Sequence, residues 1–236
     1  MKTLDPDLLL RAYSIGVFPM SDGRDAKDLY WVEPRKRAII PLDRFHLSNS
    51  LRKTLKSDRF TVTRDTAFAR IVRLCAEREE TWINGEIEAS YIRLHEANRA
   101  HSIEVWRGGE LAGGLYGVRL GAAFFGESMV SLERDASKVA LAWLVARLIA
   151  GGFRLLDCQF MTPHLATFGA VEIDQKDYLA LLASALGEGS AAAAAAGASE
   201  GPIEFDALDR LLAARPDGAG VPPPGWVIAQ LLGQTS

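Results

Sequence analysis

The sequence is poor in cysteine, with only Cys75 and Cys158 among its 236 residues. Two cysteines cannot form the disulfide framework of a small secreted protein, and they fit a reducing compartment. The longest apolar run, Val139 to Ala150, is interrupted by Arg147 and is too short to span a membrane. The first residues lack the basic and then apolar pattern of a secretory signal. We therefore expect a soluble protein of the cytoplasm.

Glycine-rich phosphate-binding motifs are also missing, because neither a Walker motif nor Gly-x-Gly-x-x-Gly occurs. Enzymes that use acyl-coenzyme A need a glycine-rich pyrophosphate cradle where a helix starts after the strands. Residues 131–138 occupy that place here, with no glycine and two acidic side chains. We therefore expect neither a nucleotide nor coenzyme A as a cofactor.

The four histidines give no sign of a metal site or of a nucleophilic pair. They are His46, His95, His101 and His164, and no pair has metal-ligand spacing with cysteine. His101 begins an expected strand and His164 lies in an expected loop, each without an evident Ser or Cys nucleophile. We expect no metal ion and no covalent intermediate.

The formal charge of −3 hides an uneven distribution. Residues 35–73 hold eleven Lys and Arg against three acids, a balance of +8, so the rest of the chain carries −11. A basic stretch on an acidic chain suits a polyanion bound by one region and a cation bound by another. The same stretch would also fit a solvated helix face, and charge alone does not separate the two interpretations.

Hydrophobic periodicity predicts a mixed α/β fold. We expect helices at residues 4–15, 48–55, 67–78, 87–98, 137–150, 180–186 and 206–214. We expect strands at residues 30–32, 38–41, 60–63, 101–107, 111–119, 122–126 and 153–160. The helix at 137–150 is apolar nearly all round and should be buried, with Ser137 as its cap. Antiparallel strands followed by a buried helix and a further strand indicate an acyltransferase-like sheet with flanking helices.

We expect a small N-terminal α+β domain at residues 1–60 and a catalytic domain at residues 61–236. An alanine-rich insert at residues 187–201 contains six consecutive alanines. Its composition is typical of a flexible linker, although alanine also favours transient helix.

Asp157 and Gln159 are two residues apart on an expected strand, so their side chains project from the same face. Both residue types are unfavourable inside so apolar a strand unless they are hydrogen-bonded or used. They are candidate site residues; alternatively, they satisfy loop backbone groups at the strand end.

Glu127 follows two phenylalanines and Gly126, where a strand gives way to a loop. A carboxylate in such surroundings can have a raised pKa or bind a cation. Gly126 would let a substrate approach the backbone closely. The alternative for Glu127 is a salt bridge with Arg134 or Lys138.

A series of ordered segments resembles the leucyl/phenylalanyl-tRNA–protein transferases over roughly residues 10 to 180. The segments are Ala12 to Met20, Trp31 to Arg37, Thr81 to Ile83, Tyr91 to His95, Ala100 to Trp106, Gly113 to Gly117, Phe125 to Met129, Ala136 to Lys138, and Asp157 to Ala170. The resemblance implies a small N-terminal domain joined to a domain of the acyl-CoA N-acyltransferase fold. It further implies transfer of Leu or Phe from aminoacyl-tRNA to proteins with N-terminal Lys or Arg, which marks them for N-degron degradation.

The resemblance also assigns site roles. Gln159 would contact the acceptor's α-amine, and Asp157 would orient or polarise Gln159. Because an amide is a poor base, the role of Gln159 would be to position the amine. Glu127 would lie near the ester and the cationic acceptor. The proton could leave through the substrate's ribose hydroxyl. The pocket for the amino acid maps onto Leu115, Leu141, Leu144 and Leu148, which by spacing alone would be core, and it could also accept Met.

The terminal adenosine of the tRNA maps onto Trp31, Trp82, Gly126 and Ser128, where the tryptophans would stack or else pack between domains. Acceptor-stem phosphates would meet Arg52, Lys53 and Lys56.

We expect this enzyme to use no cofactor and to be a monomer. Two alternative functions are compared with it. One is a coenzyme A-dependent N-acyltransferase, which the missing glycine loop disfavours. The other is a tRNA- or peptide-binding adaptor that would need neither Asp157 nor Gln159.

Overall fold

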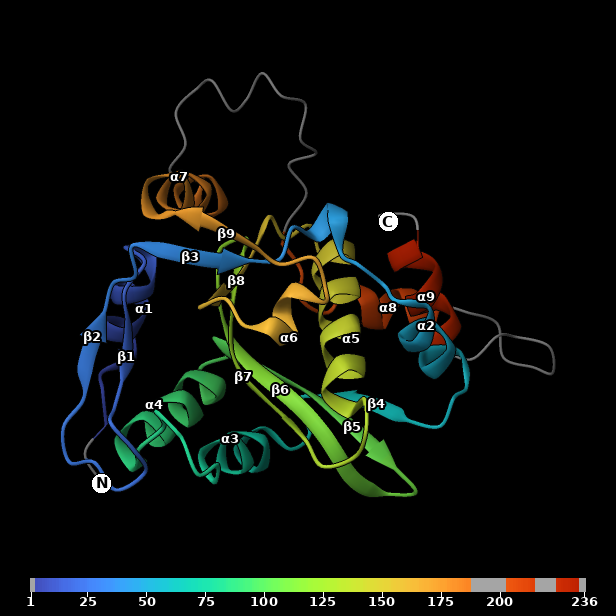
Figure 1. The fold of residues 1–236 in the computed structure, drawn as a ribbon, viewed down its shortest axis with the longest axis horizontal. Coiled ribbons are helices and arrows are strands. Elements are labelled where there is room, and N and C mark those ends of the chain that lie inside the picture. Colours follow the sequence, from blue (N-terminus) through green and yellow to red (C-terminus); the bar gives the residue numbers. More distant parts are fainter. Residues whose placement is uncertain (1–2, 188–202, 215–223, 234–236) are drawn as a thin grey trace.

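The computed structural model describes residues 3–187, 203–214 and 224–233 (Figure 1). Apart from Gly187, the predicted alanine-rich insert at residues 187–201 lies outside this described part. No helix within these ranges is long and apolar enough to cross a membrane.

A seven-stranded mixed sheet forms the centre of the molecule, in the order β4-β5-β6-β7-β8-β3-β9. Its strands are β3 (Lys36–Ile39), β4 (Thr61–Arg64), β5 (Ala100–Arg107), β6 (Glu110–Leu120), β7 (Ala123–Ser131), β8 (Leu155–Gln159) and β9 (Val171–Asp174). Among the described strands only β7 and β8 pair in parallel, because α5 (Ala136–Ala150) carries the chain back between them. The predicted α/β fold with flanking helices is confirmed.

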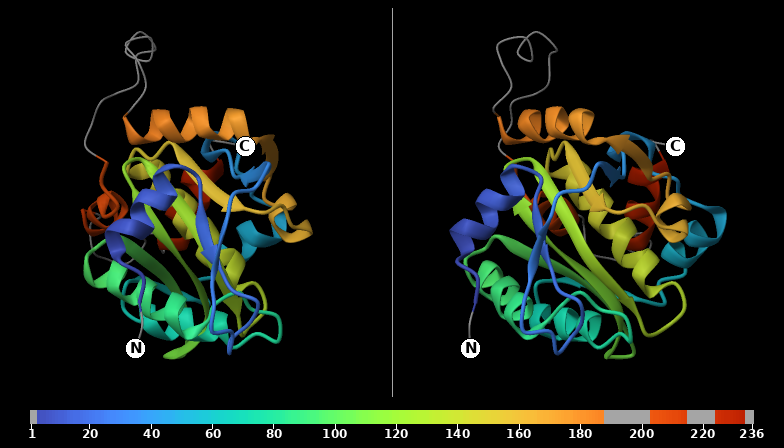
Figure 2. Two further views of the ribbon diagram at one scale, coloured as in Figure 1. Left: turned by 90° about the vertical axis from the view of Figure 1, so that its left-hand side faces the viewer. Right: turned by 60° about the vertical axis from the view of Figure 1, so that its left-hand side comes forward.

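Helices cover both faces of the sheet (Figure 2). One core lies under α5, with α2 (Asn49–Lys56), α8 (Ala207–Ala213) and α9 (Pro224–Gly233) around it. The other core lies under α1 (Pro6–Ser14), α3 (Phe68–Ala76), α4 (Gly85–Glu96) and α7 (Gln175–Leu186). Short elements complete the chain: β1 (Phe18–Met20) paired with β2 (Tyr30–Val32), the 3-10 turn η1 (Leu42–Arg44), and α6 (Pro163–Ala166).

The predicted burial of α5 is confirmed, since nearly every side chain from Ala136 to Leu148 is buried. The predicted cap is wrong, because the helix begins at Ala136. Ser131 accepts a hydrogen bond from the backbone N–H of Ser137 at 3.3 Å instead. The helix α9, which packs on α2 and α5, was not predicted.

The predicted domain boundary at residue 60 stays a prediction. Within the described chain, β3 belongs to the predicted N-terminal domain of residues 1–60, yet it lies between β8 and β9 in the central sheet. An N-terminal domain that ended at residue 60 would therefore contribute a strand to the central sheet.

Gly117 and Gly126 face each other across β6 and β7 and offer a matched test of packing. A Cβ on Gly117 would lie 2.2 Å from the Phe125 carbonyl oxygen, whereas one on Gly126 would meet only ordinary contacts from 3.5 Å. We expect Gly117→Ala to lower the free energy of unfolding by about 1–3 kcal/mol, measured by denaturant titration. Gly126→Ala should change it by less than about 1 kcal/mol, and equal losses in both variants would contradict this account.

Candidate active site

A cavity of about 410 Å³ opens where the parallel strands β7 and β8 stop pairing. Their register runs from Ala123 opposite Leu155 to Phe125 opposite Asp157 and ends there. The residues that follow on each strand, Gly126 on β7 and Cys158 on β8, line the cavity together with the face of α5. The cavity therefore lies at a break in the sheet where two strands leave backbone and side chains uncovered.

A β-bulge places Glu127 in this cavity. Gly117 of β6 pairs with Gly126, but the next residue on β6, Tyr116, pairs with Ser128, so Glu127 is the extra residue of β7. Bulges of this kind redirect a side chain that regular pleating would place elsewhere, and they are common beside active sites.

Two buried tyrosines hold the Glu127 carboxylate. Tyr13 donates to Oε1 at 2.7 Å and Tyr91 donates to Oε2 at 2.8 Å. Burial raises the pKa of Glu127 to about 7, and the two tyrosine hydrogen bonds partly oppose that rise. The alternative of a salt bridge with Arg134 or Lys138 is wrong. Both of these cations instead approach Asp135, at 3.8 and 3.3 Å.

Asp157 is wholly buried and forms an ion pair with Arg37. The Arg37 guanidinium donates to Oδ1 at 2.9 Å and to Oδ2 at 2.6 Å, and it also donates to the Gly16 carbonyl at 2.8 Å. The Tyr178 hydroxyl adds a hydrogen bond to Oδ2 at 3.0 Å. Asp157 is not among the residues that line the cavity.

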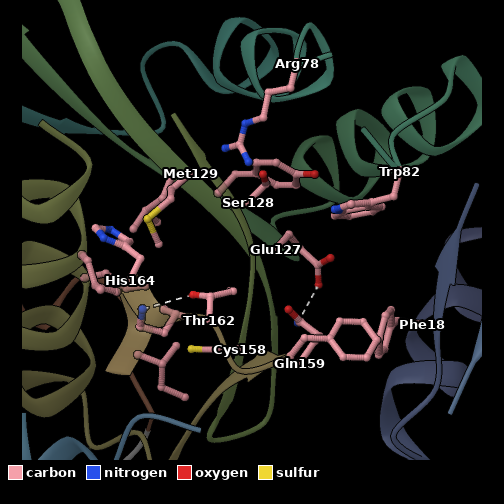
Figure 3. Close-up of a pocket in the computed structure, with 18 of the residues that line it drawn as sticks. Phe18, Arg78, Trp82, Glu127, Ser128, Met129, Cys158, Gln159, Thr162 and His164 are labelled. Carbon is pink, nitrogen blue, oxygen red and sulfur yellow. Dashed lines mark hydrogen bonds between the residues drawn. The ribbon is translucent and has the colours of Figure 1, made fainter. Parts of the chain in front are cut away.

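Gln159 links Asp157 to Glu127. Its backbone N–H donates to Asp157 Oδ1 at 2.8 Å, and its backbone takes the left-handed conformation with φ 58°. Its side-chain Nε2 donates to Glu127 Oε1 at 3.5 Å, so the two side chains point toward each other (Figure 3). Left-handed backbone costs a non-glycine residue about 1–2 kcal/mol, which the Asp157 contact offsets. Asp157 therefore positions Gln159 through the backbone.

The cavity collects most of the predicted pocket residues. Leu115, Leu141 and Leu144 line it, whereas Leu148 is buried in the core outside the lining. Other apolar residues that line the cavity are Met129, Leu156, Cys158 and Leu165, and the His164 side chain lines it as well.

Of the residues predicted to bind the terminal adenosine, Trp82, Gly126 and Ser128 line the cavity. Trp31 pairs with Pro19 in the β1–β2 hairpin, so its side chain lies on the face opposite to that of Phe18. Phe18 lines the cavity, and Trp31 is not among the lining residues. The predicted phosphate-binding residues Arg52, Lys53 and Lys56 lie on α2, outside the cavity lining.

Several residues that shape the site were not predicted to have a role in it. They are Arg37, Tyr13, Tyr91, Tyr178, Arg78 and Tyr116. Four of them, Tyr13, Arg37, Tyr91 and Tyr116, fall inside the segments that carry the family resemblance, which was the available signal. In the described ranges, no group of three or more His, Cys, Asp or Glu side chains is arranged to hold a metal ion.

Comparison with known families identifies the family of the chain. The sequence model described as leucyl/phenylalanyl-tRNA protein transferase matches residues 39–183, and the model of that family's N-terminal domain matches residues 2–35. The chain belongs to this transferase family. The predicted resemblance is confirmed, and so is the predicted enzyme class: the chain is a tRNA-dependent aminoacyltransferase that acts on proteins.

Relatives within the transferase family align along the whole chain. A leucyl/phenylalanyl-tRNA–protein transferase of Rhizorhabdus wittichii is 61% identical over 249 residues and covers 100% of both chains. One of Novosphingobium aromaticivorans is 51% identical and covers 99% of this chain and 97% of its own. Among solved structures, the crystal structure of FemX matches with a TM-score of 0.48 and 13% identity, covering 71% of this chain and 66% of that one.

The raised pKa of Glu127 predicts how its replacement changes stability with pH. A carboxyl whose pKa rises from 4.5 to about 7 on folding favours the folded state while protonated, and this contribution disappears as the pH rises through 7. We expect Glu127→Gln, which cannot ionise, to gain stability relative to the native chain between pH 5 and pH 8, by up to about 3 kcal/mol. Denaturant titrations at several pH values measure the difference. A difference that does not vary with pH would contradict the burial of an ionisable Glu127.

Proposed function

We propose that the cavity binds the aminoacyl end of a charged tRNA and that the enzyme transfers Leu, Phe or Met to proteins with N-terminal Arg or Lys. The observation that carries this proposal is the contact of Glu127 with Gln159 beside an apolar cavity. The apolar wall suits the side chain of the donor, and the carboxylate suits the cationic end of the acceptor. The product would be marked for N-degron degradation, and the enzyme would act as a cytoplasmic monomer.

In this reaction the α-amine of the acceptor attacks the ester carbonyl that joins the amino acid to the terminal ribose. A C–N bond forms, the C–O bond to the ribose breaks, and the tRNA leaves with a free hydroxyl. An α-amine has a pKa of about 8, so a useful fraction is neutral near pH 7.

The side chains around the cavity would position this amine. With Nε2 of Gln159 directed at Glu127, the amide oxygen can accept a hydrogen bond from the amine. Asp157 holds Gln159 in place through the backbone. The amine's proton passes to the ribose oxygen that leaves, so no strong protein base is required.

Arg52, Lys53 and Lys56 of α2 would contact phosphates of the acceptor stem. They lie in the basic stretch of residues 35–73, on a helix with no acidic residue in its first turn. Lys56 lies 4.2 Å from the centre of the Trp226 ring, which still leaves its ammonium group able to meet a phosphate.

The start of α5 argues against coenzyme A as the acyl donor. Asp135 lies directly before the helix and is paired with Arg59 at 3.4 Å and Lys138 at 3.3 Å. A pyrophosphate at this helix start would meet a carboxylate and cations that are already neutralised.

The transfer assay combines Leu-tRNA carrying labelled leucine with three proteins that differ only in beginning with Arg, Lys or Glu. We expect RNase-sensitive transfer to the Arg and Lys forms only. Gln159→Ala should reduce kcat by about 10- to 100-fold, because the amine loses its positioning contact. Equal transfer to the Glu form would contradict the assigned acceptor, and unchanged kcat in folded Gln159→Ala would contradict the assigned site. Binding of tRNA without transfer would favour the adaptor.

The donor preference should depend on Leu144. Leu144→Ala enlarges the cavity, so the kcat/KM ratio of Phe-tRNA to Leu-tRNA should rise by about 10-fold or more. Leu148→Ala is the matched control, because it removes the same atoms one turn further along α5 but outside the cavity lining. It should reduce stability and leave the ratio within about twofold. A rise of similar size in both variants would contradict the assigned pocket.

A further inference from the structure

Phe160, the residue that follows Gln159, leaves an aromatic ring open to solvent in the cavity. Its side chain lines the cavity and is 45% exposed. Among the described residues of the lining, it is the only exposed large hydrophobic side chain. Contact between apolar surface and water is unfavourable, so a ligand that covers this ring gains affinity. Phe160 is therefore a candidate contact for a substrate.

A tight turn brings Phe160 into this cavity. Consecutive side chains of a regular strand point to opposite faces, so Phe160 would point away from Gln159 if β8 continued. The left-handed backbone of Gln159 instead ends the strand, and the N–H of Phe160 donates back to the Cys158 carbonyl at 2.8 Å. As a result, the side chains of Gln159 and Phe160 both line the cavity. The turn that positions Gln159 therefore also places an aromatic ring beside it.

Phe18 supports the Phe160 ring from one side. The two rings meet edge to face, with centroids 5.8 Å apart and planes at 77°. Phe18 is itself buried, and the Arg37 guanidinium lies 4.8 Å from the centre of its ring. The aromatic surface that Phe160 leaves exposed is thus backed by rigid neighbours, and little conformational entropy is lost when a ligand binds to it.

The aromatic wall formed by Phe18 and Phe160 is separate from the wall assigned to the donor's side chain. Leu141 and Leu144 belong to the core under α5, whereas Phe18 belongs to the core on the other face of the sheet. Phe18 lies next to Gln159 on the side of the cavity away from α5 (Figure 3). A donor side chain that lies against α5 leaves the aromatic wall available to the second substrate.

The proposed acceptor has two cationic groups, its α-amine and the side chain of its N-terminal Arg or Lys. Glu127 is the only acid in the described lining, and its Oε1 faces Gln159, which would hold the amine. The side-chain cation is then left without a carboxylate in this lining. An aromatic ring attracts a cation through its electron-rich face, and the alkyl stem of Arg or Lys covers apolar surface. Phe160 can provide both contacts.

We propose that Phe160 is a specificity-determining residue for the acceptor, whose N-terminal Arg or Lys places its cationic side chain over the Phe160 ring. This inference rests on the proposed function, since it takes the α-amine of the acceptor to lie at Gln159. Consecutive Cα atoms are about 3.8 Å apart, so a side chain that extends from an amine at Gln159 reaches the neighbouring ring. The contact is the same before and during the attack. It therefore strengthens binding of the acceptor and leaves the chemical step unchanged.

Two peptides that differ only in their first residue test this contact, with Leu-tRNA carrying labelled leucine as the donor. One begins with Arg and the other with citrulline, which has nearly the shape of arginine but no charge. Phe160→Leu keeps an apolar side chain and removes the ring. We expect it to raise KM for the Arg peptide by about three- to fivefold with kcat unchanged. Its kcat/KM for the citrulline peptide should stay within about 1.5-fold of the native value.

Phe160→Tyr is the matched control, because it keeps the aromatic face and should leave KM for the Arg peptide close to the native value. A loss in Phe160→Leu that is equal for both peptides, or absent for the Arg peptide, would overturn the assignment of Phe160. So would a loss of the same size in Phe160→Tyr. The native chain separates these failures from that of the proposed function. If it transferred leucine to neither peptide, or to both equally well, the assigned acceptor itself would be wrong.

Discussion

The buried ion pair between Arg37 and Asp157 is the interaction on which the site depends. Moving two charges out of water costs several kcal/mol each, so such a pair persists only with good geometry and additional hydrogen bonds. Here the guanidinium contacts both carboxylate oxygens, and the Tyr178 hydroxyl, the Gly16 carbonyl and the Gln159 N–H complete the network. Loss of one partner would leave a buried charge unpaired, at a cost of about 3–5 kcal/mol.

This network joins parts of the chain that are far apart in sequence. Arg37 lies on β3, Asp157 on β8 and Tyr178 on α7, while Gly16 lies between α1 and β1. The helix that precedes Gly16 carries Tyr13, which binds Glu127. The ion pair therefore fixes the position of the N-terminal segment relative to β8. It thereby also positions Glu127 and Gln159, whose side chains meet where the pairing of β7 and β8 ends. Glu127 reaches that point through a bulge and Gln159 through left-handed backbone.

The sequence was informative about groups that are unusual for their local surroundings. Asp157, Gln159 and Glu127 are polar residues in apolar strands, and each was a candidate for that reason. Leu141, Leu144 and Leu148 were assigned to the pocket through the family resemblance, because their helical spacing alone predicted core residues. Leu148 lies outside the cavity lining, since one face of α5 passes from the cavity into the core and periodicity does not mark where the cavity ends.

Long-range pairing was beyond the sequence pattern. Tyr13 and Glu127 are 114 residues apart, and Arg37 and Asp157 are 120 apart, so no local spacing connects them. The elements that were missed are short or depend on tertiary contacts. β9 has four residues and pairs only with β3 among the described strands, and α9 lies in a proline-rich tail that becomes helical against α2 and α5. The α/β fold could be predicted because its longer strands and helices have strong periodicity.

A crystal structure with the amide-linked analogue of leucyl-adenosine would show how the donor lies in the cavity. We expect the leucyl side chain to lie against Leu141 and Leu144. The face of the carbonyl carbon that the amine attacks should lie next to Gln159 and Glu127. The space left there should admit an attacking amine at about 3–3.5 Å. An analogue bound outside the cavity, or bound with its carbonyl turned away from Gln159, would contradict it.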